Sequence, residues 1–252
     1  IKKSSLEFFN TNGLPSKKLE NWKFTSSKNF KNFNKSLSSD EVKKIESDEL
    51  SIVFINGVLD KDSLENFKFA DLIEVKNLNE LTKKELLYCS ESFLNESMFN
   101  LGVSEFENGS YISFKENSVI EEVINIKNYF FENGQNERVS SFNIFHINER
   151  SEISIIEEDI KENFSIFNLK LNKFICENSS IFKHGKSYND DSQTHSLSYN
   201  YYQIEQDVAL NVDSMVKSSF FNKEFIEVDL NKVGSDAKIN ILNLGKQEQH
   251  VD

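Results

Sequence analysis

Four related segments decide the predicted fold: ERSEI at 149–153, ENSSI at 177–181, QDVAL at 206–210 and SDAKI at 235–239. In each segment a polar turn leads into an apolar residue, and successive apolar residues are 28, 29 and 29 positions apart. A fixed period of this length is typical of repeat proteins, whose units bury their apolar faces against one another. We therefore expect the stretch from Gly109 to Gly245 to form a mainly β fold, a β-solenoid. The residues expected to stack in one column are Ile153, Ile181, Leu210 and Ile239.

Short alternating patterns fill the same region and predict strands. Val208, Leu210 and Val212, for example, alternate with Ala209 and Asn211. A period of two places one set of side chains inside and the other in water. The pattern recurs at 142–146, 153–155, 164–171, 197–201, 226–230 and 239–241. A β-sandwich would also show short alternating strands, and the fixed period favours the solenoid.

Composition limits the function. The chain has 252 residues, of which 38% are hydrophobic, which suits one large domain or a core with a small N-terminal module. Its net charge is −12, and with no basic stripe recognised we expect neither a nucleic-acid nor a membrane partner. We find no run of about 18 apolar residues and no signal-peptide layout. Cys89 and Cys176 form no disulfide framework and suit a reducing compartment, so we expect a cytoplasmic protein.

The first part of the chain, residues 1–103, predicts a small α/β region ahead of a β-helical core at 104–252. Leu6, Phe8 and Phe9 indicate one side of a short helix that stops at Gly13-Leu14-Pro15. We expect Trp22 and Phe24 to anchor this region by burying their large rings. The sequence IVFING at 52–57 predicts a strand and a hairpin turn, because Asn-Gly between apolar residues favours that turn.

Two further helices are expected. Ser39-Asp40 offers an N-cap to a short charged helix that ends near Leu50. Apolar residues between 78 and 100 recur at gaps of three and four, which predicts one helix. Gly102 is expected to end that helix before the strands begin.

Four blocks of sequence, in the same order, resemble a known family. The N-terminal signature GLP at 13–15 with ENWKFT at 20–25 is similar to that of the SufD branch of the SufB/SufD scaffold family. The strand and Asn-Gly at 52–57 follow in family order, then FENGSYI at 106–112 and HINERSEISIIEE at 146–158. SufB proteins share the solenoid but normally lack the Trp-containing signature, so the SufD branch is the better match.

The resemblance implies a right-handed parallel β-helix that serves as a non-catalytic scaffold of the SUF iron–sulfur cluster assembly complex. It implies a SufB-like scaffold partner and a SufC-like ATPase, with a cluster assembled transiently at the complex rather than bound by this chain. It also implies that the sequence covers the N-terminal region and part of the core. None of His146, His184, His195 and His250 matches the family's functional histidine, so no cluster ligand is assigned and cofactor-binding residues stay unknown.

The cysteines and histidines offer little chemistry by themselves. Cys176 shares a strand face with Phe174 and is expected to be a buried, inert thiol, because a cluster ligand needs further thiolates or histidines. His184 and His195 flank a polar loop with Asp190-Asp191, which are metal-ligand residue types. Their spacing fits no standard site, so we expect a solvated loop and no metal.

The acidic run Glu157-Glu158-Asp159 is the remaining candidate. Paired carboxylates could act as acid and base in a β-helical glycan enzyme, but neighbours on a strand point to opposite faces, so we expect a solvated turn. The sequence holds no phosphate-binding Gly-rich loop, and ATP hydrolysis would belong to a partner. We therefore predict no catalytic residues, and the alternative is an extracellular β-solenoid that binds or cleaves acidic polysaccharide.

Overall fold

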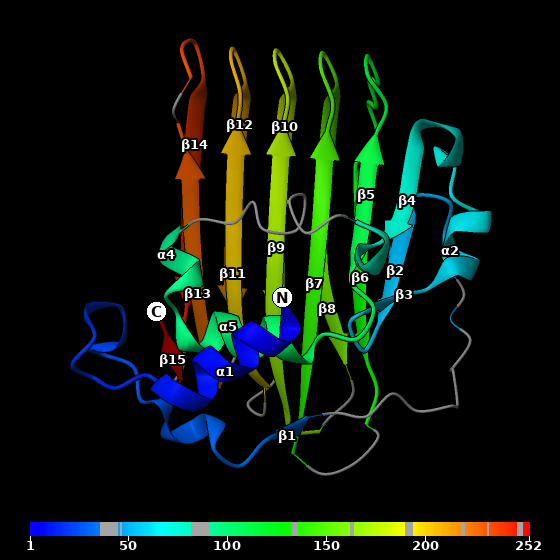
Figure 1. Cartoon of the computed structure of the whole chain (residues 1–252). Helices are drawn as coiled ribbons and strands as arrows, with labels where there is room; N and C mark the ends of the chain where they lie inside the picture. Colours follow the sequence, from blue (N-terminus) through cyan, green and yellow to red (C-terminus); the bar gives the residue numbers. More distant parts are fainter. Residues whose placement is uncertain are drawn as a thin grey trace.

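The computed structural model describes residues 1–35, 45, 47–81, 91–132, 136–161, 164–189, 194–217, 220–230, 232–245 and 249–252. Successive strands enter two sheets in turn, and nearly all strand pairs are parallel (Figure 1). The described residues thus form a β-solenoid of about four turns with a small α/β N-terminal region. The predicted fold class is confirmed.

The two sheets have the following strands. Sheet A runs in the order β15 (His250–Val251), β13 (Phe221–Asp229), β11 (Thr194–Ile204), β9 (Ile166–Cys176), β7 (Glu137–Ile147), β5 (Ser110–Phe114) and β4 (Ile73–Asn77), with β1 (Asn34–Lys35) beside β7. Sheet B runs β14 (Asp236–Leu244), β12 (Ala209–Lys217), β10 (Ile181–Asn189), β8 (Glu152–Lys161), β6 (Ile124–Phe130), β2 (Ser51–Ile55) and β3 (Val58–Leu59). The predicted hairpin is confirmed, because β2 and β3 pair antiparallel around Asn56-Gly57.

The predicted column of four apolar residues is wrong in register. Ile153 pairs with Phe182, which pairs with Leu210, which pairs with Ala237. Ile181 lies one position away, on the outer face, and Ile239 lies in the next inward row, paired with Val212. Because side chains alternate along a strand, a one-residue slip moves a residue to the opposite face.

The turns that begin sheet B strands stack on one another. Arg150, Ser179 and Asp207 have φ of 56°, 59° and 56°, and each N–H donates to a carbonyl of the next coil. Gly234 continues the column at φ 77°, a conformation that glycine adopts without steric cost, and a Cβ there would displace the Asp207 carboxylate, whose Oδ1 would lie 1.9 Å away. The predicted turn at 149–152 is confirmed, whereas the one expected at 235–238 lies at 232–234, before β14.

The outer face of sheet A is covered by the N-terminal region. The helices are α1 (Lys2–Asn12), α2 (Lys61–Glu65), α4 (Glu91–Leu94) and α5 (Ser97–Glu105), with short 3-10 helices η1 (Glu20–Trp22), η2 (Ser27–Phe30), η3 (Ala70–Leu72) and η4 (Leu78–Glu80). In Figure 1, α1 and α5 lie across the strands of sheet A. Residues of α5 and the N-terminal segment pack on outward side chains such as Leu169 and Tyr199. The central strands β7, β9 and β11 are therefore buried on both faces over most of their length.

Several N-terminal predictions need correction. Trp22 is fully buried, as expected, but Phe24 is 76% exposed and anchors nothing. Leu6 lies on the exposed side of α1. The expected 78–100 helix is not continuous, because Glu96 adopts an extended backbone between α4 and α5. Gly102 lies inside α5 rather than ending it.

A close helix–sheet contact explains that glycine. A Cβ on Gly102 would lie 3.0 Å from Leu171 Cδ1, so the missing side chain lets α5 approach sheet A. Residues 82–90, which include Cys89, lie outside the described residues, as does most of the helix expected before Leu50; residues 47–50 are not helical. The predicted boundary between the N-terminal region, 1–103, and the β-helical core, 104–252, stays a prediction.

Candidate functional site

The interior of the solenoid changes character along each coil. Near the stacked turns it is apolar, with Phe145 and Tyr202 stacked on the Phe174 ring at 5.3 and 4.7 Å. Farther from these turns, the inward positions carry buried polar groups. Six titratable side chains gather there, which we call the inner polar cluster: Glu157, Asp159, Lys170, His184, Lys186 and Glu224.

Lys170 connects two carboxylates across the interior. Its Nζ donates to Glu157 Oε1 and to Asp159 Oδ1, both at 2.8 Å, and lies 4.5 Å from the centre of the Tyr188 ring. The side chains of Lys170, Glu157 and Asp159 are only 2%, 5% and 3% exposed. Asn128 also donates to both carboxylates, at 3.0 and 3.1 Å. Buried charges need such partners, because each is costly to remove from water alone.

A second ion pair lies one coil further along. Lys186 of β10 donates to Glu224 of β13, and both side chains are buried. Asn200 Nδ2 and Ser214 Oγ donate to the same carboxylate at 2.7 and 3.0 Å. Glu224 is therefore held by three donors from three different strands.

His184 lies between the apolar and polar parts of the interior. Its Nδ1 is 2.8 Å from the Tyr202 hydroxyl, and its Nε2 is 3.6 Å from Glu157 Oε2. Burial lowers the pKa of His184, and the attraction of Glu157 only partly offsets this. This geometry fits a neutral imidazole. Its Nδ1 accepts a hydrogen bond from the Tyr202 hydroxyl, and its Nε2 carries the proton and faces Glu157.

The two carboxylates on Lys170 differ in proton affinity. Burial would raise the pKa of Glu157, but Lys170 and His184 outweigh it and hold that pKa well below its ordinary value. Burial raises the pKa of Asp159, because Lys170 compensates only in part and the Glu157 charge adds to the rise. Burial would lower the pKa of Lys170, yet Asp159 and Glu157 raise it well above its ordinary value. Asp159 is thus the carboxylate that takes up a proton first.

The enclosure of the inner polar cluster limits its chemistry. Its charges are paired with one another and face the interior, where they can hold a proton and fix the register of coils. Within the described residues, no group of three His, Cys, Asp or Glu side chains is arranged to hold a metal ion. In the same residues, no helix has the length and apolarity to cross a membrane.

The sequence prediction of a solvated acidic turn is wrong. Glu157 and Asp159 lie in β8 and point inward, while Glu158 points outward. His184 is buried in β10, not in a solvated loop. It is not brought together with His195, whose ring packs on Phe33 and Phe220 on the outer face of sheet A. Asp190 and Asp191 lie outside the described residues.

The sequence did contain a signal for the cluster. Glu157 and Asp159 continue the inward phase of Ile153 and Ile155, so the same alternation that predicted the strand also placed them inside. Cys176 is buried as predicted, and burial raises the pKa of its thiol. A protonated thiol in an apolar setting is a poor nucleophile and metal ligand.

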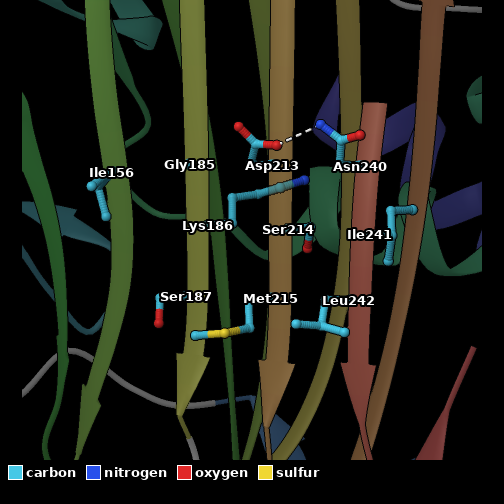
Figure 2. Close-up of a pocket in the computed structure, with 10 residues that line it drawn as sticks. All are labelled: Ile156, Gly185, Lys186, Ser187, Asp213, Ser214, Met215, Asn240, Ile241 and Leu242. Carbon is cyan, nitrogen blue, oxygen red and sulfur yellow. Dashed lines mark hydrogen bonds between the residues drawn. The ribbon is translucent and has the colours of Figure 1, made fainter. Parts of the chain in front are cut away.

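The outer face of sheet B carries a shallow hollow of about 340 Å³ (Figure 2). Gly185 leaves it open, and Ile156, Met215 and Leu242 supply apolar walls. Asn240 Nδ2 donates to Asp213 Oδ1 at 2.7 Å across neighbouring strands. The hollow offers apolar contact beside one satisfied polar pair, which suits binding rather than acid–base chemistry.

The fold defines the class of protein as a β-solenoid, in which stacked coils form a stiff body. Residues 130–252 match the family model described as SUF system FeS cluster assembly, SufBD core domain. These residues are therefore similar to a SufBD core domain, and the match does not distinguish SufB from SufD. A comparison with curated proteins found no match.

Proposed function

We propose that this chain is a non-catalytic scaffold subunit of the SUF iron–sulfur cluster assembly complex and acts in the cytoplasm with a SufB-like scaffold and a SufC-like ATPase. The observation that carries the proposal is the match of residues 130–252 to the SufBD core domain. The enclosed inner polar cluster agrees with it, because the buried charges described above are not open to a substrate.

The N-terminal signature supports the SufD branch. Trp22 within ENWKFT is fully buried, and its Nε1 donates to Glu96 Oε2 at 3.0 Å. It also packs against Phe225 of β13, with ring centres 6.1 Å apart. The signature thus has a physical role, because it fixes the N-terminal segment to the outside of sheet A.

A stiff body suits a scaffold. Each inner coil pairs its backbone with the coils on both sides, and ion pairs inside the solenoid join strands of different coils. Such a stack holds its outer surfaces at fixed positions, so partner proteins and a cluster passing between them could be kept in register. The cluster would be cargo of the complex.

Co-purification tests the proposal. The tagged chain is expressed with the SufB-like and SufC-like proteins of the same genome, and the affinity-purified sample is analysed by size-exclusion chromatography with light scattering. We expect one species that contains all three proteins, with ATPase activity that depends on the SufC-like subunit. An unrelated tagged β-solenoid serves as the control bait. Elution of the chain apart from both partners, in repeated trials, would contradict the proposal.

The polysaccharide alternative gains no support from the site. The two carboxylates that might have formed an acid–base pair, Glu157 and Asp159, are enclosed and bound to Lys170. A glycan hydrolase needs its carboxylates on either side of a bound sugar.

A further inference from the structure

The N-terminal segment carries an unusual concentration of positive charge. Residues 1–35 contain eight lysines and two glutamates, in a chain whose net charge is −12. This cluster departs from the expectation that no basic stripe is present. Six of these lysines have an exposed side chain with no ion pair to any described residue: Lys3 of α1 and, within residues 17–31, Lys17, Lys18, Lys23, Lys28 and Lys31.

Two apolar side chains stand among these lysines. Leu19 is 49% exposed and Phe24 is 76% exposed, with Lys23 Nζ 5.4 Å from the centre of the Phe24 ring. An isolated exposed apolar residue is ordinary on a protein surface. Here both flank η1 and stand among like-charged lysines, so an exposed aromatic ring and a concentration of positive charge share one surface. We call these seven residues the basic patch: Lys17, Lys18, Leu19, Lys23, Phe24, Lys28 and Lys31.

The basic patch is built on fixed anchors. Trp22, Thr25 and Phe30 are 0%, 1% and 2% exposed, and they alternate along the chain with the exposed lysines. Phe30 stacks on Phe167 of β9 at 4.7 Å, and Thr25 Oγ1 lies 3.2 Å from His250 Nε2. A basic tail in water would be disordered, whereas this segment is held against the solenoid, so its charges are pre-organised for a partner.

We propose that the basic patch binds an acidic surface of a partner subunit, with Phe24 inserted into an apolar contact surrounded by carboxylates. The inference rests on the proposed function, because it places the partner within the same assembly. Opposite charges across an interface speed association and fix register, and a large exposed aromatic side chain supplies the buried centre.

Other polyanions fit the basic patch less well. It contains no arginine, the residue that binds phosphate groups bidentately in nucleic-acid complexes. Stable attachment to a bilayer needs a broad apolar face or a lipid chain, and two apolar side chains supply neither. The acidic remainder of the chain would also be repelled by anionic lipid.

A charge-reversal variant of the full chain tests the inference. Lys17→Glu, Lys18→Glu and Lys23→Glu are combined in one chain, and Phe24→Ser is made separately. The matched control combines Lys61→Glu, Lys217→Glu and Lys238→Glu, three exposed lysines elsewhere that give the same change in net charge. Affinities for the SufB-like and SufC-like proteins are measured by calorimetry at 50 and 300 mM NaCl. Circular dichroism and thermal melting verify that every variant is folded.

We expect the patch variant to bind at least about tenfold more weakly at low salt, with a smaller salt dependence, and the control to bind within about threefold of wild type. Phe24→Ser should weaken binding about fivefold without altering the salt dependence. Equal affinities of the folded patch variant and wild type would overturn the inference while the proposed function stands. Failure of the wild-type chain to bind either partner would refute the proposed function, and this inference with it. Patch-dependent binding to phosphatidylserine vesicles or to RNA, with unchanged partner affinity, would also overturn it.

Discussion

The two parts of the solenoid interior share one backbone arrangement and differ in how they are held together. Near the stacked turns, Phe145, Phe174 and Tyr202 stack as aromatic rings across successive coils. Farther along the same strands, Lys170 and Lys186 pair with carboxylates from other strands. Apolar packing depends mainly on volume, so it tolerates shifts between similar residues. Buried ion pairs tolerate no mismatch, because a slipped coil would leave charges unpaired. The apolar part thus supplies stability through packed volume, and the polar part fixes the register of the coils.

Removal of the central ammonium group should have the largest effect. Lys170→Met leaves two buried carboxylates without their cation, which we expect to cost about 3–5 kcal/mol of unfolding free energy. Urea denaturation followed by circular dichroism measures this loss. The control is Lys183→Met, which breaks only an exposed ion pair with Glu152 and should cost less than about 1 kcal/mol. Equal costs for the two variants would remove the distinction between ion pairs inside the solenoid and ion pairs on its surface.

A cavity in the apolar part should cost somewhat less. Leu210 is 2% exposed and stacks between Phe182 and Ala237. We expect Leu210→Ala to cost about 2–4 kcal/mol, because the neighbouring side chains close the cavity only in part. Leu210→Met keeps the volume and should cost less than about 1.5 kcal/mol. If Leu210→Ala and Leu210→Met unfolded at the same urea concentration, the volume of the side chain at position 210 would not determine the stability of the apolar part.

These two parts also mark what the sequence could and could not predict. The period near 29 and the alternation of apolar residues predicted the solenoid, because both follow from stacked strands. The register was predicted one residue off at Ile181, because counting apolar residues after turns ignores that successive coils differ in length. The inner polar cluster was missed, because burial of Glu157 depends on Lys170, which reaches it from another strand. The basic patch was also missed, because the net charge of the whole chain is negative although lysines are concentrated in residues 17–31.

The two carboxylates on Lys170 should respond differently to neutralisation. Burial raises the pKa of Asp159, whereas the positive surroundings hold that of Glu157 low. We expect Glu157→Gln to cost about 2 kcal/mol, since it removes an ionised partner of Lys170, and Asp159→Asn to cost less than about half of that. Chemical denaturation at pH 7 compares the pair. A larger cost for Asp159→Asn would show that the fold stabilises the ionised form of Asp159 more than that of Glu157.

The smallest effect concerns the boundary between the two parts, where His184 is enclosed by Glu157, Tyr202, Lys186 and Glu224. Burial lowers the pKa of His184, so below pH 6.5 the unfolded chain binds a proton that the folded chain does not. Stability from this group is therefore fully present above pH 6.5 and is lost as the pH falls below that value. His184→Gln should flatten this part of the stability profile, while acid losses below pH 4.5 persist because Glu157 still protonates on unfolding. The opposite result is an equal slope of stability against pH in His184→Gln and in wild type. It would mean that the wild-type imidazole stays charged in the folded state, paired with Glu157 Oε2 at 3.6 Å, and belongs to the polar part of the interior.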